Sequence, residues 1–255
     1  MSAPAEQPFA WPQVRRIGMD APWRWLRAAL DDLRAAPAAS LFYGGVMALM
    51  GYLLGRHYDD AVGLAFITGF LLVGPFLAIG LYDVSRRRER GEAARLAPTL
   101  GAWRANAPAI GFFAVALMLT LAVWIRVSVV MVALFFPDRV PSAAEFIAQL
   151  ARAPDAWFFV LAWGASGAGL ALLVFATSAV SLPMLLDRGE MDVISAMIVS
   201  FGVLRQNFAP MMLWAAAIVA LTGFGFATWY LGLVVTLPLI GHGAWHAYRE
   251  AIEPA

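Results

Sequence analysis

The stretch AVGLAFITGFLLVGPFLAIGLYDVSRRRERGE, residues 61–92, decides the fold. Its first part, 61–82, is apolar and carries no charged side chain. A helix of roughly 20 such residues crosses the hydrocarbon core of a bilayer. Arginines follow at 86, 87, 88 and 90, and clustered arginine marks the cytoplasmic end of a span. The stretch therefore predicts a transmembrane helix that ends in the cytoplasm.

The composition of the whole 255-residue chain agrees with this stretch. Hydrophobic residues make up 62% of the chain and charged residues 14%, whereas an ordinary soluble domain is about 45–50% apolar and about 25% charged. The mean hydropathy is +0.72. All 18 basic residues are arginine, a usage associated with GC-rich bacterial genomes. We therefore expect a multi-pass protein of the bacterial inner (cytoplasmic) membrane.

Several classes of function are excluded by what the sequence lacks. It has no cysteine, which rules out disulfides, thiolate metal sites, cysteine nucleophiles and covalently attached c-type haem. The net charge of +1 provides no basic field for nucleic acid. Motifs of nucleotide-binding loops, hydrolase elbows and zinc proteases do not occur, so we expect no enzymatic activity. Residues 1–20 have no apolar segment before the arginines, and we expect no cleaved signal peptide.

We predict an all-α, polytopic membrane helix bundle with six transmembrane helices. The last apolar block, 209–241, is interpreted as two short spans because Thr222 to Gly225 are typical of a tight turn; a single long span is the alternative. The segment 127–137 either extends the third helix or lies on the membrane. Apolar runs place the first four spans at 38–55, 61–82, 107–126 and 156–186. All six belong to one domain, 20–251, between a disordered cytoplasmic N-terminus, 1–19, and a cytoplasmic tail, 252–255.

The arginines also predict the orientation of the bundle. If the N-terminus is cytoplasmic, only Arg56, Arg126, Arg139 and Arg152 of the 18 arginines fall on the outer side. This distribution satisfies the positive-inside rule. We therefore expect both termini in the cytoplasm.

The chain also shows a threefold pattern, which predicts three pseudo-repeated hairpins at about 20–92, 93–192 and 193–251. Each unit has an arginine followed by a proline, in LRAAP at 33–37, WRANAP at 103–108 and LRQNFAP at 204–210. A proline at the start of a helix loses no intrahelical hydrogen bond. We expect an interfacial amphipathic helix before each hairpin. The first would place Trp23, Leu26, Leu30 and Leu33 on one apolar stripe. Convergent use of proline and arginine at membrane ends is the alternative.

Two histidines form the candidate metal site. His242 and His246 share a helix face at i,i+4 spacing, and Asp83 occupies the position in the first unit that matches His246. These three residues would form an inner-face site for a transition metal. One haem cannot take both histidines as axial ligands because they approach from the same side, whereas single-histidine ligation or ligation across a dimer stays open. The alternative is an interfacial belt with Trp245, Tyr248 and Arg249.

The arginine cluster is the second candidate site. Arg86, Arg87, Arg88 and Arg90 could bind anionic lipid headgroups or an acidic partner, or act only to fix the topology. Small residues at Gly51 and Gly55, and at 164–169, allow close helix approach within the bundle or between subunits. Away from their ends the predicted spans lack ionisable side chains, which disfavours proton-driven transport through a buried carboxylate.

Three segments resemble one known family. They are GPFLAIGLYDVSRRRERGE at 74–92, LPMLLDRGEMD at 182–192 and PLIGHGAWHAYRE at 238–250. The chain resembles a bacterial integral membrane protein family catalogued as domain of unknown function 2189. Some members are labelled as cytochrome c oxidase subunits, which implies a link to the respiratory chain. This sequence lacks the several intramembrane histidines of a haem–copper catalytic subunit.

Two functions from different classes follow. The first is a non-catalytic accessory, assembly or scaffold protein that binds membrane lipids, other inner-membrane proteins or a second copy of itself. The second is a protein that handles a small solute or a metal through His242, His246 and Asp83. No cofactor is required by the first function, whereas the second would use a transition metal or haem.

Overall fold

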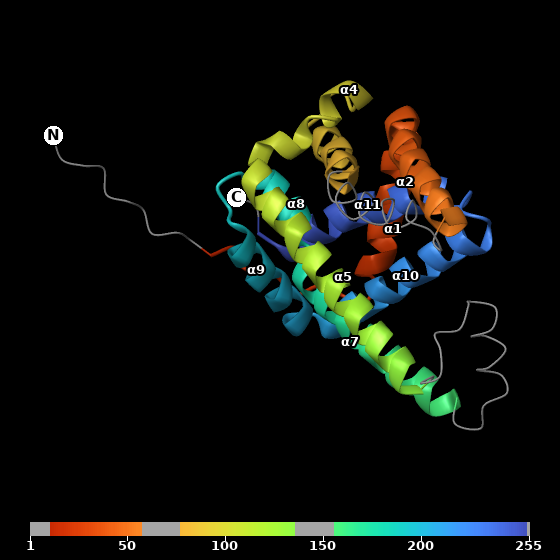
Figure 1. Ribbon diagram of the computed structural model, residues 1–255. Coiled ribbons are helices and arrows are strands. Elements are labelled where there is room, and N and C mark those ends of the chain that lie inside the picture. The colour runs from red at the N-terminus through yellow and green to blue at the C-terminus, as the bar shows by residue number, and fades with distance from the viewer. Residues whose placement is uncertain (1–10, 58–76, 136–155, 254–255) are drawn as a thin grey trace.

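The computed structural model describes residues 11–57, 77–135 and 156–253. In these ranges the regular elements are helices, apart from a single β-bridge between Val14 and Ile252 (Figure 1). The helices are α1 (Ala21–Ala35), α2 (Pro37–His57), α4 (Leu96–Thr99), η1 (Ala102–Asn106), α5 (Ala107–Phe135), α7 (Ala156–Ser178), α8 (Ser181–Asp187), α9 (Val193–Gln206), α10 (Phe208–Ala227) and α11 (Leu233–Ala251). Residues 77–89 are also helical.

The expected membrane class is confirmed by the length and composition of these helices. Four candidate spans occur in the described part of the chain, at Pro37–Arg56, Leu96–Phe135, Trp157–Asp187 and Phe208–Ala227. The predicted span at 61–82 lies mostly outside the described residues. The third predicted span corresponds to α5, which continues without a break to Phe135, so residues 127–135 extend this helix. The fourth predicted span is divided between two helices, because α7 ends at Ser178 and α8 begins at Ser181.

Proline begins three of the apolar helices, as the sequence predicts. Pro37 is the first residue of α2, Pro108 the second of α5 and Pro210 the third of α10. The first turn of a helix has no carbonyl partner for its N–H groups, so proline costs nothing there.

The predicted position of the last turn is wrong. Two helices do form from the final apolar block, but residues 222–225 lie inside α10 and the turn spans 228–232. Thr228 stabilises this turn because its Oγ1 accepts a hydrogen bond from the Gly232 N–H at 2.9 Å. Gly225 serves a different purpose, since a Cβ atom there would overlap the side chain of Leu233. The glycine permits close packing of α10 on α11 and does not make the turn.

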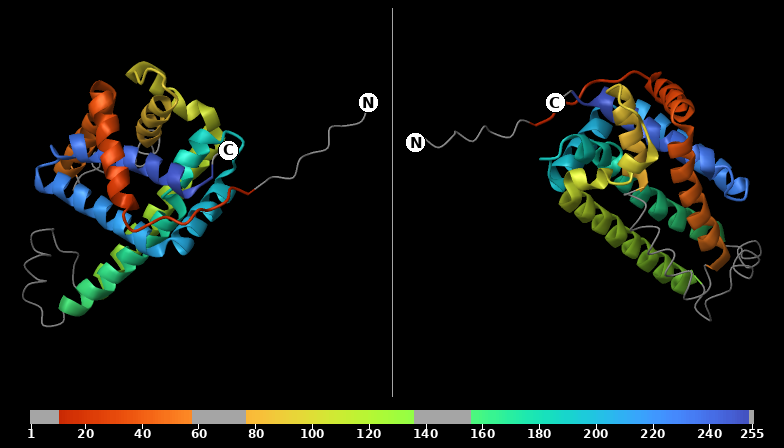
Figure 2. Two further views of the ribbon diagram at one scale, coloured as in Figure 1. Left: turned by 180° about the vertical axis from the view of Figure 1, so that it is seen from behind. Right: turned by 90° about the horizontal axis from the view of Figure 1, so that it is seen from above.

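Helix α11 lies at the centre of the bundle. Helix α1 makes the largest interface with it, followed by α2 and α10 (Figures 1 and 2). Trp25 of α1 meets Trp214 of α10 edge to face, with ring centroids 5.6 Å apart. Gly44 brings α2 onto α11, because a Cβ atom there would overlap the backbone carbonyl of Val234.

The packed face of α1 differs from the predicted stripe. Trp23 is 63% exposed, whereas Trp25 is 1% exposed and faces α10 and α11 together with Ala29 and Asp32. Asp32 is not part of the predicted apolar stripe, yet it is buried because α11 and residues 77–89 supply its partners. The helix is amphipathic as expected, with its contact face rotated relative to the predicted one.

Helices α5 and α7 lie side by side and project from the rest of the molecule (Figures 1 and 2). The buried residues of α5, Ala109, Ile110, Phe113 and Ala114, lie where the pair meets α8 and α9. In α7, Ala176 is buried near this end and Phe159 near the other. The remainder of the pair presents apolar side chains outward.

Candidate functional site

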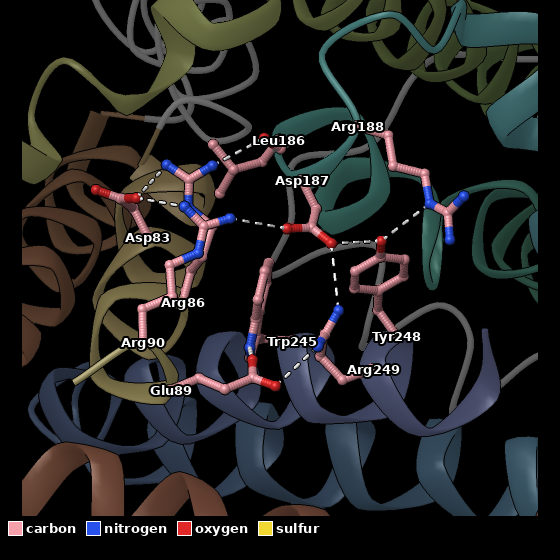
Figure 3. A network of polar contacts seen from close by, with 10 residues as sticks. All are labelled: Asp83, Arg86, Glu89, Arg90, Leu186, Asp187, Arg188, Trp245, Tyr248 and Arg249. Carbon is pink, nitrogen blue, oxygen red and sulfur yellow. Dashed lines mark hydrogen bonds and ion pairs between the residues drawn. The ribbon is translucent and has the colours of Figure 1, made fainter. Parts of the chain in front are cut away.

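A polar cluster lies where α1, α8, residues 77–92 and the second half of α11 converge. It has two adjoining parts. One is centred on Asp32 and the two histidines of α11. The other is centred on Asp187 and is shown in Figure 3. Both parts lie at the end of α11 beyond Gly241, and Asp187 is the last residue of the candidate span Trp157–Asp187.

Asp32 is the acceptor at the centre of the first part. Its Oδ2 atom accepts hydrogen bonds from Ser85 Oγ at 2.5 Å and from His246 Nε2 at 2.8 Å. Its Oδ1 atom accepts from the guanidinium of Arg88. Burial alone would raise the pKa of Asp32, but the hydrogen bonds from His246 and Ser85 outweigh it and hold the pKa below its ordinary value. The carboxylate is therefore charged at neutral pH.

His242 is fully buried beside Asp32. Its Nε2 atom is 2.9 Å from Ser40 Oγ, and its Nδ1 atom is 2.8 Å from Ser85 Oγ. Ser85 gives its one hydrogen to Asp32, so its oxygen accepts from Nδ1–H of the imidazole. Burial lowers the pKa of His242 to about 4 despite the nearby negative charge of Asp32. At neutral pH the ring is uncharged and links α2 to residues 77–89.

Asp83 is also fully buried, but its partners are arginines of its own helix. Arg86 donates to Oδ1 from Nη2 at 2.6 Å, and Arg87 donates to Oδ2 from Nε at 2.7 Å. Arg86 also donates from Nη1 to the Leu186 carbonyl at 3.0 Å. This pairing joins residues 77–89 to α8.

Asp187, at the end of α8, centres the second part of the cluster (Figure 3). Tyr248 donates its hydroxyl hydrogen to Oδ2 at 2.8 Å, and Arg249 Nη1 lies 3.4 Å from the same oxygen. Arg90 approaches Oδ1 at 3.6 Å. Burial raises the pKa of the Tyr248 phenol to about 12, and the charge of Asp187 adds to the effect, so the hydroxyl keeps its hydrogen.

Glu89 provides a second carboxylate that binds side chains of α11, in addition to Asp187. It accepts hydrogen bonds from Trp245 Nε1 at 3.1 Å and from Arg249 Nε at 3.0 Å. The three residues predicted to form an interfacial belt, Trp245, Tyr248 and Arg249, therefore all bind carboxylates of other elements. Trp245 and Tyr248 are themselves buried.

The structure brings the two predicted histidine ligands together, but not with Asp83. They meet Asp32 instead, with His242 Nδ1 at 3.9 Å and His246 Nε2 at 2.8 Å from Oδ2. Within the described ranges, no group of three or more His, Cys, Asp or Glu side chains is arranged to hold a metal ion. The chemistry of this cluster is hydrogen bonding and ion pairing between helices.

The four arginines predicted to bind lipid or a partner are engaged within the chain. Arg86 and Arg87 bind Asp83, Arg88 binds Asp32, and Arg90 faces Asp187. Their exposure increases along the sequence, from 16% of the side chain at Arg86 to 53% at Arg90. The arginine with the most surface available to an external anion is therefore Arg90.

Two apolar cavities lie at the opposite end of α11, and Tyr230 lines both of them. Their volumes are about 240 Å³ and about 470 Å³. Side chains of α2, α10, α11 and the 228–232 turn line them, among them Met47, Tyr52, Phe226 and Leu237. Linings of this kind accommodate hydrocarbon.

Comparison with known proteins supports the membrane assignment. Residues 63–187 match the family described as predicted integral membrane protein (DUF2189). The resemblance found from the sequence is thus confirmed over this segment, which contains the 74–92 motif in full and the first six residues of the 182–192 motif. No curated protein and no solved structure matches the chain. The family description gives integration into a membrane and leaves the activity to be argued from the structure.

Proposed function

We propose that this protein is a non-catalytic component of the bacterial inner membrane, an accessory, assembly or scaffold protein that binds lipid and partner membrane proteins. The observation that carries this proposal is the outward surface of α5. Helix α5 forms most of the candidate span Leu96–Phe135, and none of the residues in the most hydrophobic part of this span is buried. In the other three candidate spans the buried share is 33%, 44% and 22%. A helix of this length exposes its side chains to lipid or to another protein.

The outward side of α7 supports a protein partner in particular. Gly164, Ala165, Ala168 and Gly169 are all exposed, and a Cβ atom added at Gly164 or Gly169 would meet no atom within 4 Å. Only Gly167 turns inward, where Trp124 packs on it. Small residues let helix backbones approach closely in a membrane. A face of this kind, directed away from its own bundle, suits a helix of another chain.

The polar cluster supports the same proposal by its architecture. Its charged groups pair across α1, α8, α11 and residues 77–92. Buried ion pairs and hydrogen bonds of this kind fix the arrangement of helices. One end of the protein is thereby held rigid, and the α5–α7 pair projects from it.

Site-specific photo-crosslinking in native membranes tests the proposal. We expect a photoreactive residue at Ala168 of α7 to yield a discrete protein adduct, and one at Leu119 of α5 to yield lipid adducts. The Gly164→Leu/Gly169→Leu variant should abolish the protein adduct, because the new side chains prevent close approach. Gly111→Leu is the matched control, since its added side chain also enters open space. Lipid adducts alone at both positions would refute partner binding.

We also infer the finer topology of six spans, three repeated hairpins and two cytoplasmic termini. The hairpin of α10 and α11 and the three helix-opening prolines support it. The polar cluster supports it too, because Val14 pairs with Ile252 in the β-bridge and the adjoining Glu253 carbonyl accepts from Arg188. A reporter fused after residue 255 should be active only in the cytoplasm. A C-terminal reporter active only in the periplasm would contradict six spans.

A further inference from the structure

Helix α9 carries an apolar stripe on its outward face. Ile194, Ile198 and Phe201 are 67%, 55% and 53% exposed, and their spacing of four and three residues places them on one side of the helix. Arg205 continues the same stripe four residues later and is also exposed. The opposite face, including Ala196, Val199 and Val203, is buried.

This stripe lies at the level of the polar cluster. Helix α9 begins shortly after α8, whose last residue is Asp187, and ends directly before α10 (Figure 1). It crosses the junction of α7 and α8, where Ser181 Oγ donates to the Ala196 carbonyl at 3.0 Å. The helix therefore connects elements at the end of the bundle that contains the ion pairs. An apolar face in water at this level would be unfavourable, whereas the boundary between headgroups and acyl chains accommodates it.

The outward face of α1 provides a contrast within the same protein. It exposes Trp23, but the rest of the face is charged, with Arg24, Arg27, Asp31 and Arg34. A face of that composition is compatible with water. Helix α9 has no such charges between Ile194 and Phe201, so the two helices present surfaces for different surroundings.

Arg205 and Arg16 supply positive charge beside the stripe. The side chain of Asn207 accepts from the Ile17 N–H and donates to the Arg15 carbonyl, both at 2.9 Å, which holds residues 15–17 against the end of α9. Arg16 and Arg205 are exposed. In the part of the chain that the structure describes, neither has the carboxylate partner that Arg86 to Arg90 all have.

We propose that α9 lies in the inner headgroup region and, with Arg16, binds an anionic phospholipid. The acyl chains contact Ile194, Ile198 and Phe201, and the phosphate accepts hydrogen bonds from Arg16 and Arg205. Guanidinium groups bind phosphate oxygens strongly. This inference rests on the proposed lipid-binding function and assigns it to a surface other than the 86–90 cluster, whose arginines pair with carboxylates of the chain.

Lipid binding by the purified protein in detergent tests this inference. Native mass spectrometry would measure retention of added phosphatidylglycerol by the wild type and by Arg16→Gln/Arg205→Gln. Each arginine near an anionic surface is worth about fivefold in affinity, so the double variant should lose about 30-fold. Arg27→Gln removes an exposed arginine of α1 and should retain the wild-type affinity.

A second variant and a competitor separate the remaining explanations. Ile194→Gln/Ile198→Gln should reduce the affinity for phosphatidylglycerol without affecting the crosslink from Ala168. That crosslink tests the proposed function separately. Glycerol 3-phosphate should not displace the lipid; equal competition would show a phosphate site without a lipid and overturn the proposal. A self-crosslink from Phe201 would assign the stripe to a second copy and also overturn it, as would unchanged retention in the arginine double variant.

Discussion

Replacing Asp32 with alanine should destabilise the protein far more than the same change at its neighbour Asp31. The Asp32 side chain is 3% exposed and accepts from Ser85, His246 and Arg88. The Asp31 side chain is 54% exposed and lies 3.8 Å from Arg34. The two residues are adjacent in α1 and differ only in what surrounds them, so Asp31→Ala is a control matched in chemistry and in helix propensity.

The expected magnitudes follow from these contacts. Removing one partner of a buried charge pair costs about 3–5 kcal/mol. Because Arg88 is 38% exposed, water replaces part of its interaction, and we expect about 3 kcal/mol for Asp32→Ala. The exposed pair at Asp31 is worth about 0–1 kcal/mol. At 25 °C, 3 kcal/mol changes the unfolding equilibrium by roughly 100-fold.

Unfolding of the purified protein in detergent, followed by circular dichroism during denaturant titration, would measure the difference. The cycle Asp32→Ala, Ser85→Ala and the double variant isolates the Ser85 contribution. We expect the destabilisation of the double variant to be smaller than the sum of the destabilisations of the two single variants, because Asp32→Ala already removes the acceptor of Ser85. If Asp32→Ala were no more destabilising than Asp31→Ala, the central role of Asp32 would be refuted.

The remaining predictions concern pH, close packing and metal. The pKa of His242 is about 4 in the folded protein and about 6.5 in the unfolded chain. The free energy of unfolding should therefore fall by roughly 3 kcal/mol as the pH decreases from 6.5 to 4. In His242→Gln, thermal melts over the same pH range should show a smaller decrease. Gly225→Ala should cost about 1–3 kcal/mol because its Cβ overlaps Leu233, whereas Gly223→Ala enters open space and should leave the melting temperature unchanged or higher. A chelator should leave the melting temperature unchanged, and elemental analysis should find less than one metal per chain. One bound metal that is lost in His242→Ala/His246→Ala would instead support the metal-handling function.

The sequence was sufficient for features that depend on local pattern. Apolar runs predict the membrane class, and prolines predict where α2, α5 and α10 begin. Each of these signals acts over at most one helix length, and its physical cause is present in the same segment. The α10–α11 turn shows the limit: glycines marked a turn at 222–225, but Gly225 is required by packing on Leu233, and Thr228 stabilises the turn itself.

The partners of buried charges could not be predicted in the same way. The burial of Asp32 was not predicted, because its compensating groups, Ser85 and His246, lie 53 and 214 residues away in the sequence. Asp83 is a different case. Arg86 and Arg87 follow it at i+3 and i+4, which is a recognisable pairing on a helix, so the sequence contained the signal that it binds arginine. The threefold pattern matched Asp83 with His246, but Asp83 pairs with Arg86 and Arg87 and His246 with Asp32.

The distribution of contacts separates the protein into two parts with different physical requirements. The second half of α11 binds Ser40 of α2, Asp32 and Trp25 of α1, and Asp187 of α8 through His242, His246, Glu250 and Tyr248. Apolar side chains have no hydrophobic drive to associate inside lipid, so such polar contacts supply much of the specificity of helix packing. In the described residues, a side-chain hydrogen bond from Trp163 to Ser128 joins α7 to α5, and the buried residues of α5 lie at the end of the pair that meets α8 and α9. Substitutions in the two parts should therefore be additive. Asp32→Ala should lower stability without changing the crosslink from Ala168, and Gly164→Leu should remove the crosslink without changing stability. Coupling between the two would show that partner binding depends on the polar cluster, and that the cluster is part of the binding site.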